Sequence, residues 1–100
     1  HPLPNDILFG RGGLTNHHPG NKTYRQVIHD HKADYQLAAK ITKPRVARRI
    51  VHAIRNSHPP ARFLKKESTD HMWRDVGDKA ASEKTSQALR EKSPEEKKAI

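Results

Sequence analysis

The apolar positions in the first half of the chain predict a long helix. Between residues 21 and 39 they recur at spacings of three and four, which places them on one helical face, and Asn21 is a suitable N-cap. The residues that share this face are Tyr24, Val27, Ile28, His31, Tyr35 and Ala38. We expect the face to be buried, with His31 as a core histidine whose hydrogen bonds are satisfied.

A second helix is predicted from Lys43 to Arg55, because apolar and basic positions separate when they are placed at about 100° per residue. One arc contains Val46, Ala47, Ile50, Val51 and Ile54. The opposite arc contains Arg45, Arg48, Arg49, His52 and Arg55. Thr42 or Lys43 caps this helix, Pro44 lies in its first turn, where a missing N–H is not needed, and it ends near Asn56.

Residues 61–66 and 71–76 have the short apolar character of strands. A polar loop at 67–70 joins them, so this region predicts a β-hairpin. Phe63 and Trp73 can pair on one side of the hairpin. The other side would then carry Leu64, Met72 and Val76. The pattern does not decide which side is buried.

A third helix is predicted after Gly77, with Asp78 as its N-cap and Ser93-Pro94 at its end. Its narrow apolar side contains Ala80, Ala81, Thr85, Ala88 and Leu89. Its outward side contains Lys79, Glu83, Ser86, Gln87 and Arg90. Near the N-terminus, the apolar run at 7–9 forms either a short strand or a hydrophobic anchor.

Together these elements predict a small single α+β domain. It has three helices, a β-hairpin between helices 2 and 3, and a short N-terminal strand or loop element. We expect a lead-in at 1–4, the domain at 5–92 and a flexible tail at 93–100. The chain has 100 residues, of which 32% are hydrophobic, so its core is modest. We expect it to be a domain of a longer protein.

Net charge is the compositional feature that bears most on function. The formal charge is +9, and such an excess opposes compactness through self-repulsion. Binding to nucleic acid is its commonest reason, ahead of an anionic membrane surface or an acidic protein partner. The chain has no cysteine, which excludes disulfides and thiolate metal sites. No apolar run approaches membrane-spanning length, so we expect no membrane partner.

Several motifs resemble those of a known family. They are N-D-I-L-F-G-R-G-G at 5–13, T-N-H-H-P-G-N at 15–21, and shorter runs at 43–45, 62–64, 73–76 and 84–91. Together they resemble a domain of unknown function that is abundant in proteins of diatoms and related algae. The resemblance covers about residues 5–91. It implies a nuclear, gene-regulatory parent protein, and it implies no established activity.

We predict that the domain binds double-stranded DNA. Guanidinium groups stay charged and pair with phosphate oxygens, so the second helix would bind the backbone through Lys43, Arg45, Arg48 and Arg49. Glutamine can hydrogen-bond the edge of adenine, and arginine can hydrogen-bond the edge of guanine. The third helix would therefore contact base edges through Ser86, Gln87 and Arg90. The alternatives are a merely solvated basic face and an ordinary polar helix face.

The glycine-rich loop at 10–13 has three interpretations. Its backbone N–H groups can form an anion nest. Arg11 can enter a minor groove, whose negative potential attracts arginine. The glycines can also simply permit a tight bend, which is compatible with Arg11 contacting DNA. Near the hairpin tip, Lys65 and Lys66 either bind the DNA backbone beside the groove or protect an edge strand.

Metal binding is the remaining candidate chemistry. Eight histidines, among them His17, His18, His29 and His31, superficially suit a metal-dependent nuclease. However, His29 and His31 are two residues apart on a helix and point in different directions, and no carboxylate stands at ligand spacing. We predict no catalysis, metal or cofactor.

The expected partners are double-stranded DNA and other domains of the parent chain, in the nucleus. The alternatives are a module that binds an acidic protein and a metal-dependent nuclease.

Overall fold

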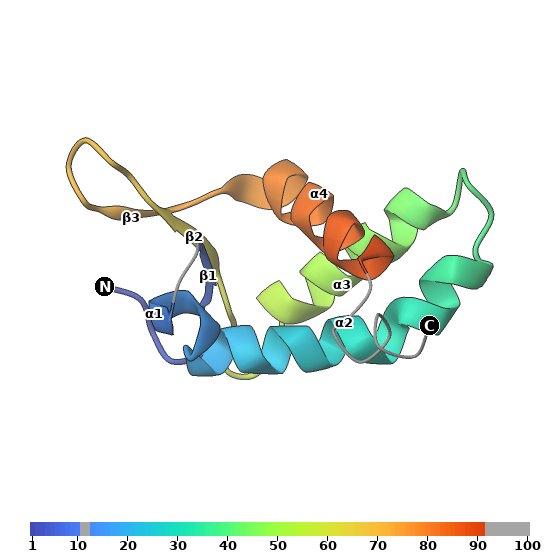
Figure 1. Ribbon diagram of the computed structural model, residues 1–100, viewed down its shortest axis with the longest axis horizontal. Coiled ribbons are helices and arrows are strands. Elements are labelled where there is room, and N and C mark those ends of the chain that lie inside the picture. The colour runs from blue at the N-terminus through green and yellow to red at the C-terminus, as the bar shows by residue number, and fades with distance from the viewer. Residues whose placement is uncertain (11–12, 92–100) are drawn as a thin grey trace.

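The computed structural model describes residues 1–10 and 13–91, which form a small sheet beside a group of helices (Figure 1). In chain order the elements are β1 (Ile7–Phe9), α1 (Gly13–Asn16), α2 (Pro19–Leu37), α3 (Lys43–Arg55), β2 (Phe63–Lys66), β3 (Trp73–Asp75) and α4 (Gly77–Arg90). The predicted α+β class, with three long helices and a hairpin between the second and third, is confirmed. The four-residue helix α1 is an addition that the hydrophobic pattern does not predict.

The predicted apolar face of the first long helix is confirmed. Tyr24, Ile28 and Tyr35 are buried, and the remaining positions of that face are half-buried, with Ala38 at the C-cap of α2. The prediction that Asn21 caps this helix is wrong, because α2 begins at Pro19 and His18 occupies the N-cap position. Proline suits the first turn because its missing N–H has no intrahelical partner there. Asn21 therefore lies inside the helix, where its buried side chain is free for another role.

The sheet has the strand order β1-β2-β3, with β1 parallel to β2 and β2 antiparallel to β3. The predicted N-terminal strand and the hairpin are both confirmed. The predicted pairing of side chains on the hairpin is wrong. Trp73 is opposite Lys66, and Asp75 is opposite Leu64. Because directly opposite residues face the same side, Trp73 shares a side with Leu64, and Phe63 lies on the other.

Phe63 anchors the sheet to the helices. Its side chain is fully buried, and Tyr24 of α2 meets its ring edge-on with centroids 5.8 Å apart. The hydroxyl of Tyr24 in turn lies 2.9 Å from that of Thr85, so α2 is also joined to α4. Ile7, the β1 partner of Phe63, is buried in the same core. The described core therefore lies between one side of the sheet and the three long helices.

The N-terminal motif fixes strand β1 through two buried polar side chains. The carboxylate of Asp6 accepts hydrogen bonds from the backbone N–H groups of Leu3 and Arg62, at 2.7 and 3.0 Å. The guanidinium of Arg62 adds an ion pair at 2.7 Å. On the free edge of β1, the amide of Asn21 accepts from the N–H of Leu8 at 2.8 Å and donates to its carbonyl at 2.9 Å. The side chain thus satisfies backbone groups that a fourth strand would otherwise pair.

Gly20 permits this close approach of α2 to β1. A Cβ at this position would overlap the carbonyl oxygen of Asp6 and lie 2.6 Å from that of Asn5. These neighbours are backbone atoms, which cannot rotate away as a flexible side chain could. The motif residues Asp6, Gly20 and Asn21 are therefore structural, since each has a partner or a steric constraint inside the domain.

Candidate nucleic-acid interface

The outward face of α3 carries the basic residues predicted from sequence. Its opposite face is anchored in the core by Ala47, Ile50 and Val51, which are buried. Arg45, Arg48 and Arg49 are exposed, as the periodicity predicts. Lys43 is half-buried, and its ammonium lies over the ring of Tyr35 at 5.4 Å from the centroid. Lys43 therefore already has an attractive partner within the domain.

Some of the described arginines form ion pairs within the domain and others do not. Arg55, Arg62 and Arg74 each form an ion pair with an aspartate. Arg45, Arg48 and Arg49 form no hydrogen bond or ion pair with any described residue. No described carboxylate therefore compensates the positive charge on the outward face of α3.

Arg55 belongs to α3 but does not join this exposed set. Its guanidinium donates two hydrogen bonds to Asp75, at 2.7 and 2.8 Å, and lies over the ring of Phe63 at 5.4 Å. Its Nε is 2.6 Å from a carboxylate oxygen of Asp78 but makes no hydrogen bond, so that contact is an ion pair alone. The hydrogen bonds raise the pKa of Arg55 and lower the pKa of Asp75. The periodicity groups Arg55 with the exposed arginines, but the side chain is half-buried and neutralised by Asp75 and Asp78.

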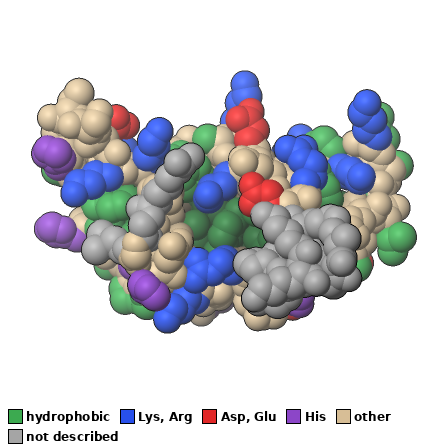
Figure 2. Space-filling model, viewed as in Figure 1, with side chains coloured by type: hydrophobic (Ala, Val, Ile, Leu, Met, Phe, Trp, Pro, Cys, Tyr) green, Lys and Arg blue, Asp and Glu red, His purple; other side chains and the backbone are tan. Residues whose placement is uncertain are grey.

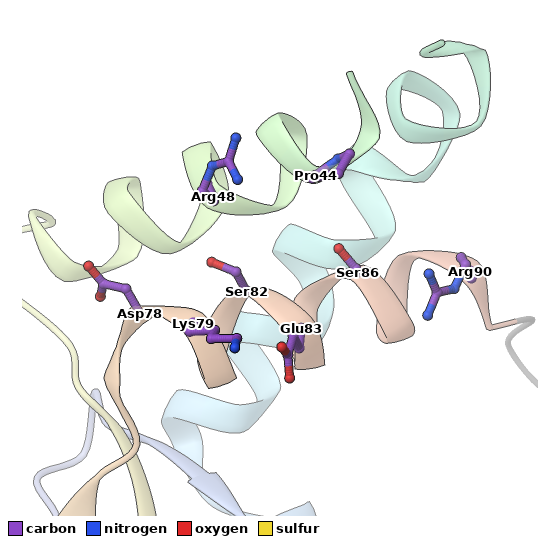
Figure 3. A pocket seen from close by; sticks show the side chains of 8 residues that line it. All are labelled: Pro44, Arg48, Asp78, Lys79, Ser82, Glu83, Ser86 and Arg90. Carbon is purple, nitrogen blue, oxygen red and sulfur yellow. The ribbon is translucent and has the colours of Figure 1, made fainter. Parts of the chain in front are cut away.

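Helices α3 and α4 run antiparallel and border a groove of about 600 Å³ (Figure 3). Its lining residues are Pro44, Arg48, Asp78, Lys79, Ser82, Glu83, Ser86 and Arg90. In Figure 3 the hydroxyls of Ser82 and Ser86 point toward α3, whereas the carboxylate of Glu83 points away from it. The groove therefore combines cations on both helices with hydroxyl groups between them.

The three residues proposed to contact bases do not share one surface. Ser86 and Arg90 are four residues apart and line the groove together. Gln87 is exposed on a neighbouring face, where its amide donates to the carboxylate of Glu91 at 3.1 Å. The apolar side of α4 agrees with the sequence pattern, because Ala81, Thr85 and Leu89 are fully buried. Whether these residues bind nucleic acid stays a prediction.

The other predicted basic contacts lie apart from α3. Lys65 and Lys66 are exposed at successive positions of β2, and successive strand residues point to opposite sides of a sheet. They therefore cannot face one backbone segment together. Arg11 lies outside the described residues. On the face in Figure 2, lysine and arginine side chains extend across the width of the molecule, with few acidic side chains among them.

Sequence reasoning missed Ser82 and Lys79 as possible contact residues. Ser82 lies four residues before Ser86, and this spacing places both hydroxyls on one side of a helix. This four-residue spacing was sufficient to place the two serines together. The sequence alone does not show that α3 lies opposite this side of α4.

The histidines do not assemble a metal site in the described part of the chain. No group of three or more histidine, aspartate or glutamate side chains comes close enough there to bind a metal ion. His31 is half-buried, and its Nδ1 lies 2.8 Å from the carbonyl oxygen of Val27. Separately, none of the helices within residues 1–10 and 13–91 has both the length and the apolar character needed to cross a membrane.

These features define a small α+β domain with an arginine face that no described carboxylate neutralises. Comparison with known families identifies it further: residues 6–91 match the model of a domain of unknown function, DUF6824, and the chain belongs to that family. No curated protein and no solved structure shows a significant match.

Proposed function

We propose that this domain binds double-stranded DNA, mainly through its phosphate backbone. The observation that supports the proposal is the set of three exposed arginines on α3, Arg45, Arg48 and Arg49, which have no carboxylate partner among the described residues. Unpaired guanidiniums match phosphate oxygens with parallel hydrogen bonds. The net charge of +9 favours the same class of partner.

The proposal assigns two different roles within the surface. The arginine face of α3 positions the domain on the backbone, a contact that carries no sequence information directly. Gln87 and Arg90 on α4, together with Arg11, are the residues that we propose for base contacts and sequence preference. In this account the domain is part of a nuclear, gene-regulatory protein and has no catalytic activity.

The direct test is the binding of fluorescent random-sequence duplexes across a series of salt concentrations. We expect binding near 50 mM salt that weakens steeply toward 200 mM, with a log–log slope of about −0.9 for each phosphate contacted. An acidic peptide carrying few charges should give a shallower slope. Absence of duplex binding near 50 mM salt would overturn the proposal.

A further inference from the structure

The groove between α3 and α4 contains two hydroxyl groups with no partner among the residues that the structure describes. Serine and threonine inside helices often bond back to the carbonyl four residues earlier, and Thr85 does so with Ala81 at 2.8 Å. Ser82 and Ser86 are half-buried, and neither forms a hydrogen bond with another described residue. Both point toward α3 in Figure 3. Two hydrogen-bond donors are therefore available at one place in the groove.

Cationic side chains line both walls of the groove. Arg48 belongs to the α3 wall, and Lys79 and Arg90 belong to the α4 wall. None of the three forms an ion pair with a described residue, so their long side chains can turn over the groove. The groove walls therefore supply positive charge as well as a pair of hydroxyl donors.

The two carboxylates of the lining do not cancel this charge equally. Asp78 is engaged by the Nε of Arg55 at 2.6 Å. Glu83 has no described cationic partner, but its carboxylate points away from α3 in Figure 3. We therefore expect Glu83 to act at the rim, where it would weaken the attraction for an anion without occupying its place.

We propose that this groove is a phosphate-binding site. Ser82 and Ser86 donate hydrogen bonds to the phosphate oxygens, and Arg48 and Lys79 close over them from the two walls. A phosphate offers only acceptor oxygens, which suits a lining of hydroxyl, guanidinium and ammonium donors. The phosphate can come from the DNA backbone or from a free phosphorylated molecule. The first source rests on the proposed DNA binding, and the second does not.

The site itself is tested with inorganic phosphate on the full chain. We expect saturable changes in the NMR signals of residues 82–86 at constant ionic strength. In the double variant Ser82→Ala/Ser86→Ala, phosphate affinity should fall about tenfold. Alanine favours helix, so α4 should remain folded.

The matched control is Ser68→Ala in the exposed hairpin loop, which should keep wild-type affinity. Glu83→Gln should tighten phosphate binding severalfold.

Duplex DNA binding by the same variants identifies the source of the phosphate. If the serine pair weakens both phosphate and duplex binding, and phosphate competes with DNA, the site binds the backbone. If it weakens phosphate binding alone, the site binds a free phosphorylated molecule. If it changes neither affinity, the groove is not a phosphate site. That last result leaves the arginine face of α3 untouched, because Arg45 and Arg49 lie outside the groove lining and are tested separately.

Discussion

The side-chain amide of Asn21 pairs with both backbone polar groups of Leu8, as a neighbouring strand would do. Strand β1 has β2 on one side only, so its other edge would leave these groups without partners. Both residues are buried, and water cannot easily replace the amide. The local sequence makes Asn21 look like a helix N-cap. Its role in the structure is to close the edge of the sheet.

Asn21→Ala should lower the free energy of unfolding by about 2–4 kcal/mol. The substitution removes two hydrogen bonds and leaves a buried N–H and carbonyl of Leu8 unsatisfied. Chemical denaturation measures the change, with Asn5→Ala at an exposed position of the same motif as the control. A loss below about 0.5 kcal/mol, within the range of ordinary surface substitutions, would show that the sheet edge does not need this amide.

Gly20→Ala should destabilise the domain by about 2 kcal/mol or more, because the new methyl group collides with backbone carbonyls of residues 5 and 6. The control is Gly13→Ala, also in a helix, where a Cβ would meet only the side chain of His17 at an ordinary 3.6 Å. We expect the control to retain wild-type stability in thermal denaturation. Equal effects of the two substitutions would contradict the steric account.

The ion pair of Asp6 predicts a loss of stability in acid. Burial alone would raise the pKa of Asp6, but hydrogen bonds from Arg62 and Leu3 outweigh it and keep the pKa below 3.8. The stability that this carboxylate contributes is therefore complete above the unfolded-state pKa, near 3.8, and is lost as the pH falls through the lower folded-state value.

Denaturation at a series of pH values checks this prediction. The unfolding free energy of the wild type should decline below about pH 4. Asp6→Asn should be less stable at neutral pH and should decline less steeply in acid, because one of the titrating groups is gone. A variant curve that stays parallel to the wild type throughout would assign the acid sensitivity to other groups.

The long helices could be predicted from sequence because their signals are local. Spacings of three and four identify the buried sides of α2 and α4, and Pro44 marks the start of α3. The parallel pairing of Ile7 with Phe63 could not be predicted in this way, since a short strand carries no signal for a partner far along the chain. The same limit explains Asn21, whose partner lies on another element.

The candidate site shows the same division between local and distant information. Periodicity correctly places Arg45, Arg48 and Arg49 at the surface. It places Arg55 there too, although the fold pairs Arg55 with Asp75 and Asp78. Periodicity could not predict this pairing, because the two aspartates belong to β3 and α4, which meet α3 only after the chain has folded back. A helix face therefore predicts which charges point outward, but not which of them the fold later neutralises.

Replacing Arg55 by alanine should therefore affect stability, whereas replacing Arg49 by alanine should affect DNA binding. Arg55→Ala should lower the unfolding free energy by about 1–3 kcal/mol, because it removes charge-assisted hydrogen bonds to Asp75. It should leave duplex affinity nearly unchanged in the folded protein. Arg49→Ala should change stability by less than about 0.5 kcal/mol and weaken duplex binding. Denaturation and fluorescence anisotropy together measure both effects. A reversed pattern would mean that the two sets of arginines are wrongly assigned.

The central claim is that the exposed face of α3 contacts DNA phosphates. Its most direct test is the salt dependence of duplex binding by Arg45→Ala/Arg49→Ala, compared with Lys22→Ala/Lys40→Ala, which removes the same charge from exposed positions outside α3. If both arginines contact phosphates, the magnitude of the log–log slope should fall by about 1.8 in the arginine variant and stay at the wild-type value in the lysine variant. Equal slopes in the two variants would contradict the claim, because the binding would then depend on net charge and not on this face.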